Sequence, residues 1–65
     1  MKAIMVDDKV VSLEQLKSAE IVKANTKNYD IRIEYHSGEF THVGYGSQSE
    51  MKELLWNIYN RYAAE

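Results

Sequence analysis

The C-terminal third of the chain carries an amphipathic helical pattern whose apolar face must be covered by the rest of the molecule. Between Ser47 and Tyr62, apolar side chains recur at three- and four-residue steps, which places them on one face of a helix. The face consists of Met51, Leu54, Leu55, Ile58 and Tyr62. Ser47, followed three residues later by Glu50, forms a capping box and predicts that the helix begins there. We expect the preceding residues to form a sheet beneath it.

The clearest strand lies at Tyr29–Tyr35, where apolar and charged residues alternate. The loop His36-Ser37-Gly38 and a returning strand at Glu39–Tyr45 complete a hairpin. Glycine stands at the loop position where φ is positive in a three-residue loop with a bulge.

The loop length decides which side chains of the returning strand face the helix. A three-residue loop turns one set toward the core and leaves Phe40 outside; that set is Thr41, Val43 and Tyr45. A two-residue turn at Ser37-Gly38 would bury the alternate set, which is Phe40, His42 and Gly44. We favour the longer loop because it buries more branched and aromatic surface.

The N-terminal residues predict further short strands. Ala3–Val6 and Val10-Val11 flank the triplet Asp7-Asp8-Lys9, which is typical of a small hairpin or sharp bend. Ser12–Asn25 has two interpretations. Ser12 and Gln15 fit a helix cap, with apolar residues at every third position; these are Leu13, Leu16, Ala19 and Val22. The alternative, which we favour, is a single turn at 13–16 and a strand at 19–24 that supports the hairpin as a third strand.

The order of these elements predicts one α+β domain, with a small antiparallel sheet of three to five strands at 1–46 and a helix at 47–62 packed across one face. The residues that define the order are Val10–Leu13, Leu16, Ile21, Tyr29–Ile33, Ser37–Glu39 and Ser47–Ile58. In this order the chain resembles a group of small, mostly uncharacterised bacterial and bacteriophage proteins with a β-meander and a C-terminal helix. The end of the chain is also similar to the strand-turn-strand-helix unit of LytTR-type DNA-binding domains. The basic residues of their base-reading loops are absent here, so that activity is not carried over.

The composition excludes several classes of site. The chain of 65 residues has no cysteine, so disulfides and thiolate metal sites are excluded. Its apolar start ends at Asp7-Asp8, too soon for a signal peptide, and no stretch is long enough to span a membrane. We therefore expect a cytoplasmic protein. A domain this small has a marginal core, and self-association is the remaining way to stabilise it.

No group of residues predicts catalysis or a cofactor. His36 and His42 lack the further ligands of a metal site, and Asp7-Asp8 lacks the spacing of a calcium loop. Gly44–Ser47 precedes a helix but matches no phosphate-binding signature. So small a domain is not expected to form a pocket on the order of hundreds of Å³. We therefore predict no enzyme activity, no metal or other cofactor and no small-molecule substrate.

A second stripe on the predicted helix, rotated away from the covered face, has no obvious partner within the chain. It contains Trp56 and Tyr59, which are favoured interface anchors because they bury a large area with few rotatable bonds. We predict a protein interface made of Trp56, Tyr59, Ala63, Lys52 and Phe40. Its expected partner is a second copy, in a homodimer, or a larger protein on which the chain docks as an accessory or inhibitory component, in keeping with a phage or mobile-element origin.

Two other interpretations stay open. Trp56 could fold back over a sheet edge and close the core. Sheet aromatics could instead stack on single-stranded nucleic acid with help from Arg32; these are Tyr29, Tyr35, Phe40 and Tyr45. The net charge of −2 opposes phosphate contacts, so protein binding ranks first.

Overall fold

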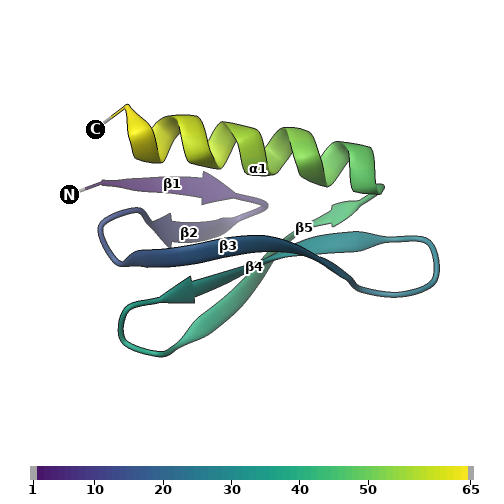
Figure 1. Ribbon diagram of the computed structural model, residues 1–65, viewed down its shortest axis with the longest axis horizontal. Coiled ribbons are helices and arrows are strands. Elements are labelled where there is room, and N and C mark those ends of the chain that lie inside the picture. Colours follow the sequence, from purple (N-terminus) through teal and green to yellow (C-terminus); the bar gives the residue numbers. More distant parts are fainter. Residues whose placement is uncertain (1, 65) are drawn as a thin grey trace.

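The computed structural model describes residues 2–64, which form five antiparallel strands followed by one helix (Figure 1). The elements are β1 (Ala3–Val6), β2 (Lys9–Ser12), β3 (Leu16–Lys23), β4 (Tyr29–Tyr35), β5 (Phe40–Gly46) and α1 (Gln48–Ala63). β1 and β2 form a two-stranded sheet, and β3, β4 and β5 form a three-stranded sheet in chain order. The predicted α+β class with a C-terminal helix across a small sheet is confirmed.

The core lies between α1 and the three-stranded sheet. α1 contacts all three strands of that sheet. Ile31, Ile33 and Val43 project from the strands and Met51 and Ile58 from the helix, and all five side chains are buried. Complete burial of one such side chain contributes roughly 1.5–3 kcal/mol, so this contact holds the layers together.

The β1–β2 hairpin packs beside the helix on the side of β5. Val6 and Val11 enter the core, and Lys9 Nζ donates a hydrogen bond of 2.8 Å to the carbonyl oxygen of His42 in β5. Asp7 and Asp8 form the two-residue turn and have φ values of 48° and 66°, as expected for a primed turn. The predicted hairpin is therefore confirmed.

The ambiguous segment is a turn followed by a strand. Leu16 N donates to Leu13 O at 3.4 Å, which closes the short turn, and Leu13 N donates to Lys2 O at 2.8 Å. β3 starts at Leu16, earlier than the predicted Ala19, because Leu16 pairs with Tyr35 across a bulge. The helical interpretation of residues 12–25 is wrong.

The β4–β5 hairpin has the three-residue loop that we favoured. Ile33 pairs with Thr41, and Gly38 adopts a φ of 94° while its N–H donates to Tyr35 O at 2.9 Å. Phe40 consequently lies outside the core. β5 is displaced by one residue from the predicted Glu39–Tyr45.

The prediction that Tyr45 faces the core is wrong, because the ladder slips at a bulge. Tyr29 pairs with Gly46, and Gly44 has a φ of 78°. Tyr45 turns outward, where its hydroxyl accepts hydrogen bonds from Asn25 Nδ2 at 2.6 Å and Asn28 Nδ2 at 3.0 Å. At this point of β5 the helix therefore packs closely against the backbone of Gly44, and Tyr45 is not buried beneath it.

Substitution of Gly44 should lower the stability of the fold far more than substitution of Gly38, the other glycine with a positive φ. A Cβ at Gly44 would lie 2.7 Å from Leu54 Cδ2 and 3.0 Å from Met51 Sδ, whereas a Cβ at Gly38 meets nothing within 4 Å. We expect Gly44→Ala to lower the free energy of unfolding by about 2 kcal/mol or more, and Gly38→Ala by about 1 kcal/mol. Urea unfolding of both variants measures the difference, and equal losses would contradict the packing argument.

The helix start matches the predicted capping box. Glu50 N donates to Ser47 Oγ at 3.1 Å, and Ser47 N donates to Glu50 Oε1 at 2.9 Å. The hydrogen bond from the Ser47 backbone, followed by that from its side chain, holds the pKa of Glu50 below its ordinary value of 4.5. α1 spans Gln48–Ala63, within one residue of the predicted bounds, with Ser47 as the N-cap.

Acid should therefore weaken the start of α1. A carboxyl group with a depressed folded pKa stabilises the fold above its ordinary pKa, and this contribution is lost as the pH falls through the folded value. We expect the urea midpoint to drop between about pH 5 and about pH 3 by more in the parent than in Glu50→Gln, which keeps a capping partner but cannot ionise. Equal acid sensitivity of the two proteins would disprove the assignment.

Candidate functional site

Three aromatic side chains form an exposed row along α1. Trp56 is 61% exposed, Tyr59 54% and Tyr62 49%. The Trp56 and Tyr59 rings stack, with centroids 5.6 Å apart and planes at 29°. The structure therefore does not place Trp56 in the core. Tyr62, predicted on the buried face, is also half-exposed because it lies where that face meets solvent.

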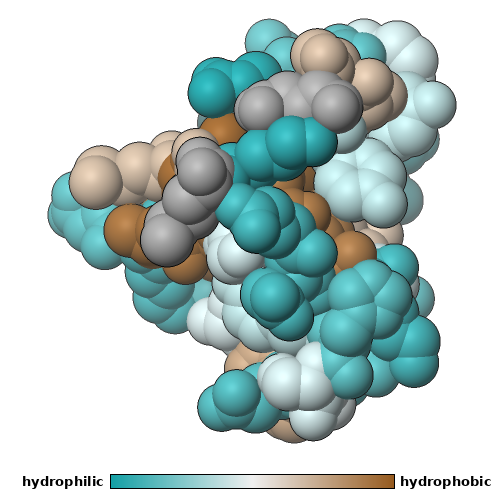
Figure 2. Space-filling model, turned by 90° about the vertical axis from the view of Figure 1, so that its left-hand side faces the viewer, coloured by the Kyte–Doolittle hydropathy of each residue, from teal (hydrophilic) through white to brown (hydrophobic). Residues whose placement is uncertain are grey.

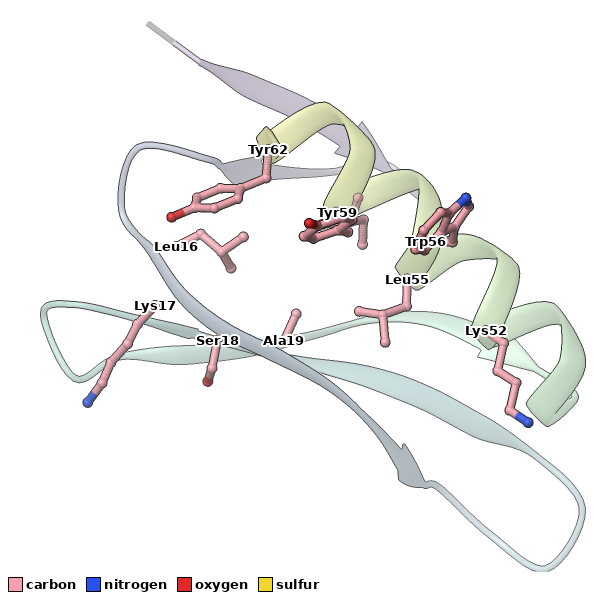
Figure 3. A pocket seen from close by; sticks show the side chains of 10 residues that line it. Leu16, Lys17, Ser18, Ala19, Lys52, Leu55, Trp56, Tyr59 and Tyr62 are labelled. Carbon is pink, nitrogen blue, oxygen red and sulfur yellow. The ribbon is translucent and has the colours of Figure 1, made fainter. Parts of the chain in front are cut away.

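The row borders an apolar groove of about 420 Å³ between α1 and β3 (Figure 3). The helix side consists of Lys52, Leu55, Trp56, Ile58, Tyr59 and Tyr62, and the strand side of residues 16–19. The groove is open because β3 is an edge strand of its sheet, while the hairpin covers the other flank of the helix. Figure 2, which views the molecule from the end where both termini lie, shows hydrophobic side chains between helix and sheet. The expectation that so small a chain forms no pocket of this size is wrong.

The two charged side chains that line the groove differ in their surroundings. Lys17 and Lys52 belong to its opposite ends, but the side chain of Lys17 points away from the helix (Figure 3). Lys17 Nζ lies 3.8 Å from Glu34 Oε2, while Lys52 has no ion pair among residues 2–64. The groove thus offers an apolar floor and an aromatic wall, with the ammonium group of Lys52 at one end.

The structure brings together some of the predicted interface residues and separates others. Trp56, Tyr59 and Lys52 line the groove, and Ala63 is exposed in the last turn of α1. Phe40 lies on the sheet face opposite the helix, so it does not share a surface with Trp56. The strand side, residues 16–19, was not predicted, because its exposure depends on the strand order.

The aromatic side chains of the sheet do not form one stacking surface. Tyr29 and Tyr35 pack against the core, whereas Phe40 and Tyr45 lie near opposite ends of β5. The guanidinium of Arg32 covers Phe40, with its carbon 4.6 Å from the ring centroid. This arrangement gives the nucleic-acid interpretation no contiguous platform.

Within residues 2–64, no group of three or more histidine, aspartate or glutamate side chains is arranged to hold a metal ion. In the same part of the chain, no helix has the length and apolarity needed to cross a membrane. Comparisons with protein-family models, curated proteins and solved structures found no match to this chain.

If the aromatic row serves binding and not folding, its removal should cost little stability. We expect Trp56→Ala to change the free energy of unfolding by less than about 1 kcal/mol, because the indole is mostly exposed. Ile58, two residues away and 1% exposed, is the matched core position, and Ile58→Ala should cost about 2–5 kcal/mol. Urea unfolding measures the free energy of unfolding of both variants. If Trp56→Ala loses as much stability as Ile58→Ala, the indole belongs to the core.

Proposed function

We propose that this protein is a small protein-binding module whose groove between α1 and β3 docks a segment of a protein partner. The observation that carries the proposal is the row of exposed, partly stacked rings along an open apolar groove. Such rings are favoured anchors in protein interfaces. The function fits an accessory or inhibitory component of a larger assembly.

The extent of the row indicates a partner that also touches the strand side. Aromatic side chains bury roughly 150–250 Å² each, so three half-exposed rings offer on the order of 300 Å². A standard interface needs about 800 Å² from each partner. The rings therefore form the centre of a contact that extends over β3 and the groove ends.

The shape favours a protein segment over a small molecule. Leu16 and Ile58 are buried in the floor, but the aromatic wall is more than half open to solvent at Trp56 and Tyr59. Small-molecule sites usually enclose most of their ligand and present several placed polar groups. A chain segment passing along the groove matches the open wall better.

Site-specific photocrosslinking in the cells that make the protein tests the proposal. A photoreactive phenylalanine analogue at Tyr59 should form a discrete adduct with one protein. The same analogue at Glu53, an exposed position on the helix outside the groove lining, is the matched control. Identification of the adduct by mass spectrometry supports the proposal when it is specific to position 59; no adduct, or the same adducts from both positions, would refute it.

A further inference from the structure

We infer that the segment docking on the aromatic row is the α1 helix of a second copy, so that two helices pack antiparallel around a two-fold axis. The inference rests on the proposed function and names its partner. It is carried by the spacing and sizes of four exposed side chains on α1, by the charge at one end of this set, and by the area that the set can bury.

Four exposed side chains follow one another along α1 at steps of four, three and four residues. This set, called the outer seam, consists of Lys52, Trp56, Tyr59 and Ala63. The steps are those of the a and d positions of a heptad, which face the partner when two helices pack along their length. Ile58, in the core, is two residues from Trp56 and therefore about 200° away around the helix. All strands lie on one side of α1 in Figure 1, so the described residues leave the outer seam uncovered.

The outer seam is self-complementary when two copies run in opposite directions. Its steps read the same from either end, so two antiparallel seams share one register along their whole length. In this register Trp56 packs on Tyr59 of the second copy, and the two-fold axis repeats this contact. The long side chain of Lys52 faces Ala63 of the second copy, the smallest of the four. Large rings thus meet at the centre, and a long side chain meets a small one at each end.

Charge favours the antiparallel direction over the parallel one. In a parallel pair around a two-fold axis each seam residue faces its own copy, so two Lys52 ammonium groups would meet. In the antiparallel pair Lys52 lies beside the last turn of the other helix, where carbonyl oxygens carry partial negative charge. The same register sets Glu53 beside Asn60 of the second copy, which is uncharged. No like charges of the two helices therefore meet at the seam.

The available area is that of a weak and reversible dimer. The three half-exposed rings offer on the order of 300 Å². Leu55, which lines the groove next to the seam, and the stem of Lys52 raise this to about 500 Å² per copy. The total of about 1,000 Å² is at the lower limit of a specific interface, so we expect a dissociation constant on the order of 0.1 mM. Each seam is occupied by the other, so association ends at two copies.

Sedimentation equilibrium of the intact chain tests the pairing. Between about 10 μM and about 2 mM, the mass of the parent should rise from one copy to two and stop there. Trp56→Ala should weaken association at least about tenfold, because it removes two central contacts from each dimer. Phe40→Ala is the matched control, since Phe40 is equally exposed but lies on the other face of the sheet. It should associate like the parent.

A pair of charge reversals tests the position of Lys52. Lys52→Glu places a carboxylate beside the last turn of the other helix and should weaken the dimer at least about fivefold. Arg61→Glu changes the net charge by the same amount at an exposed helix position outside the outer seam. It should have a smaller effect, and urea unfolding verifies that both variants are folded.

Single thiols test the direction, because the chain has no cysteine. Positions 52 and 63 of different copies are adjacent in the antiparallel pair. Two copies of the same position, by contrast, lie eleven residues, or about 16 Å, apart along the helices. A short bismaleimide should therefore link Lys52→Cys to Ala63→Cys when the two variants are mixed, and should link neither variant to itself. Adding Trp56→Ala to both variants should prevent the link.

A parent that stays monomeric at about 2 mM, equal weakening by Trp56→Ala and Phe40→Ala, or equal effects of the two charge reversals would overturn the inference. Linkage of either thiol variant to itself would also overturn it. If Tyr59 crosslinks to another protein in cells while the purified chain stays monomeric, the proposed function stands and only the second copy is excluded. If no adduct forms and the chain stays monomeric, both proposals fail.

Discussion

The close approach of α1 to β5 at Gly44 fixes where the helix lies on the sheet. Leu54 and Met51 lie where a side chain at position 44 would stand, and the positive φ of this glycine belongs to the bulge that shifts the register of the β4–β5 ladder. The helix is thereby held near β5, with the β1–β2 hairpin beside it. The opposite flank, over Leu16 and Ala19 of the edge strand β3, stays uncovered. The groove is thus a consequence of how the core packs.

This asymmetry gives the helix one buried face and one accessible face. Its centre, at Met51 and Ile58, is buried, while Trp56 and Tyr59 are turned toward the uncovered flank. A wider sheet would cover these rings, and a narrower one would leave too little core for so short a chain. Three strands and a separate hairpin support the helix and leave one side accessible.

Much of the fold could be predicted because local signals agreed with one another. The alternation at Tyr29–Tyr35, the glycine in the following loop and the cap at Ser47 each specify an element without reference to the rest of the chain. Tyr45 could not be placed, because its direction depends on a contact between Gly44 and the helix that is distant in sequence. Local alternation predicts that Tyr45 faces the core, whereas the packing of the helix against Gly44 turns it outward.

The candidate site was predictable only on its helix side. The spacing of Trp56 and Tyr59 relative to the buried stripe identifies them from the sequence alone. The strand side requires knowing that β3 is an edge strand, which depends on the pairing order. The sequence predicts Phe40 in the same interface because Phe40 is apolar and lies outside the core, but the hairpin register places it on the other face of the sheet.

The edge of β3 also limits how an occupant can bind. A bulge between Leu16 and Ser18 interrupts the ladder beside the groove, and Lys17 is an exposed charge on the same edge strand, 3.8 Å from Glu34. Both features discourage a further strand from pairing with an edge. In the proposed function, a partner is therefore held through side chains inserted against the aromatic row and not through extension of the sheet.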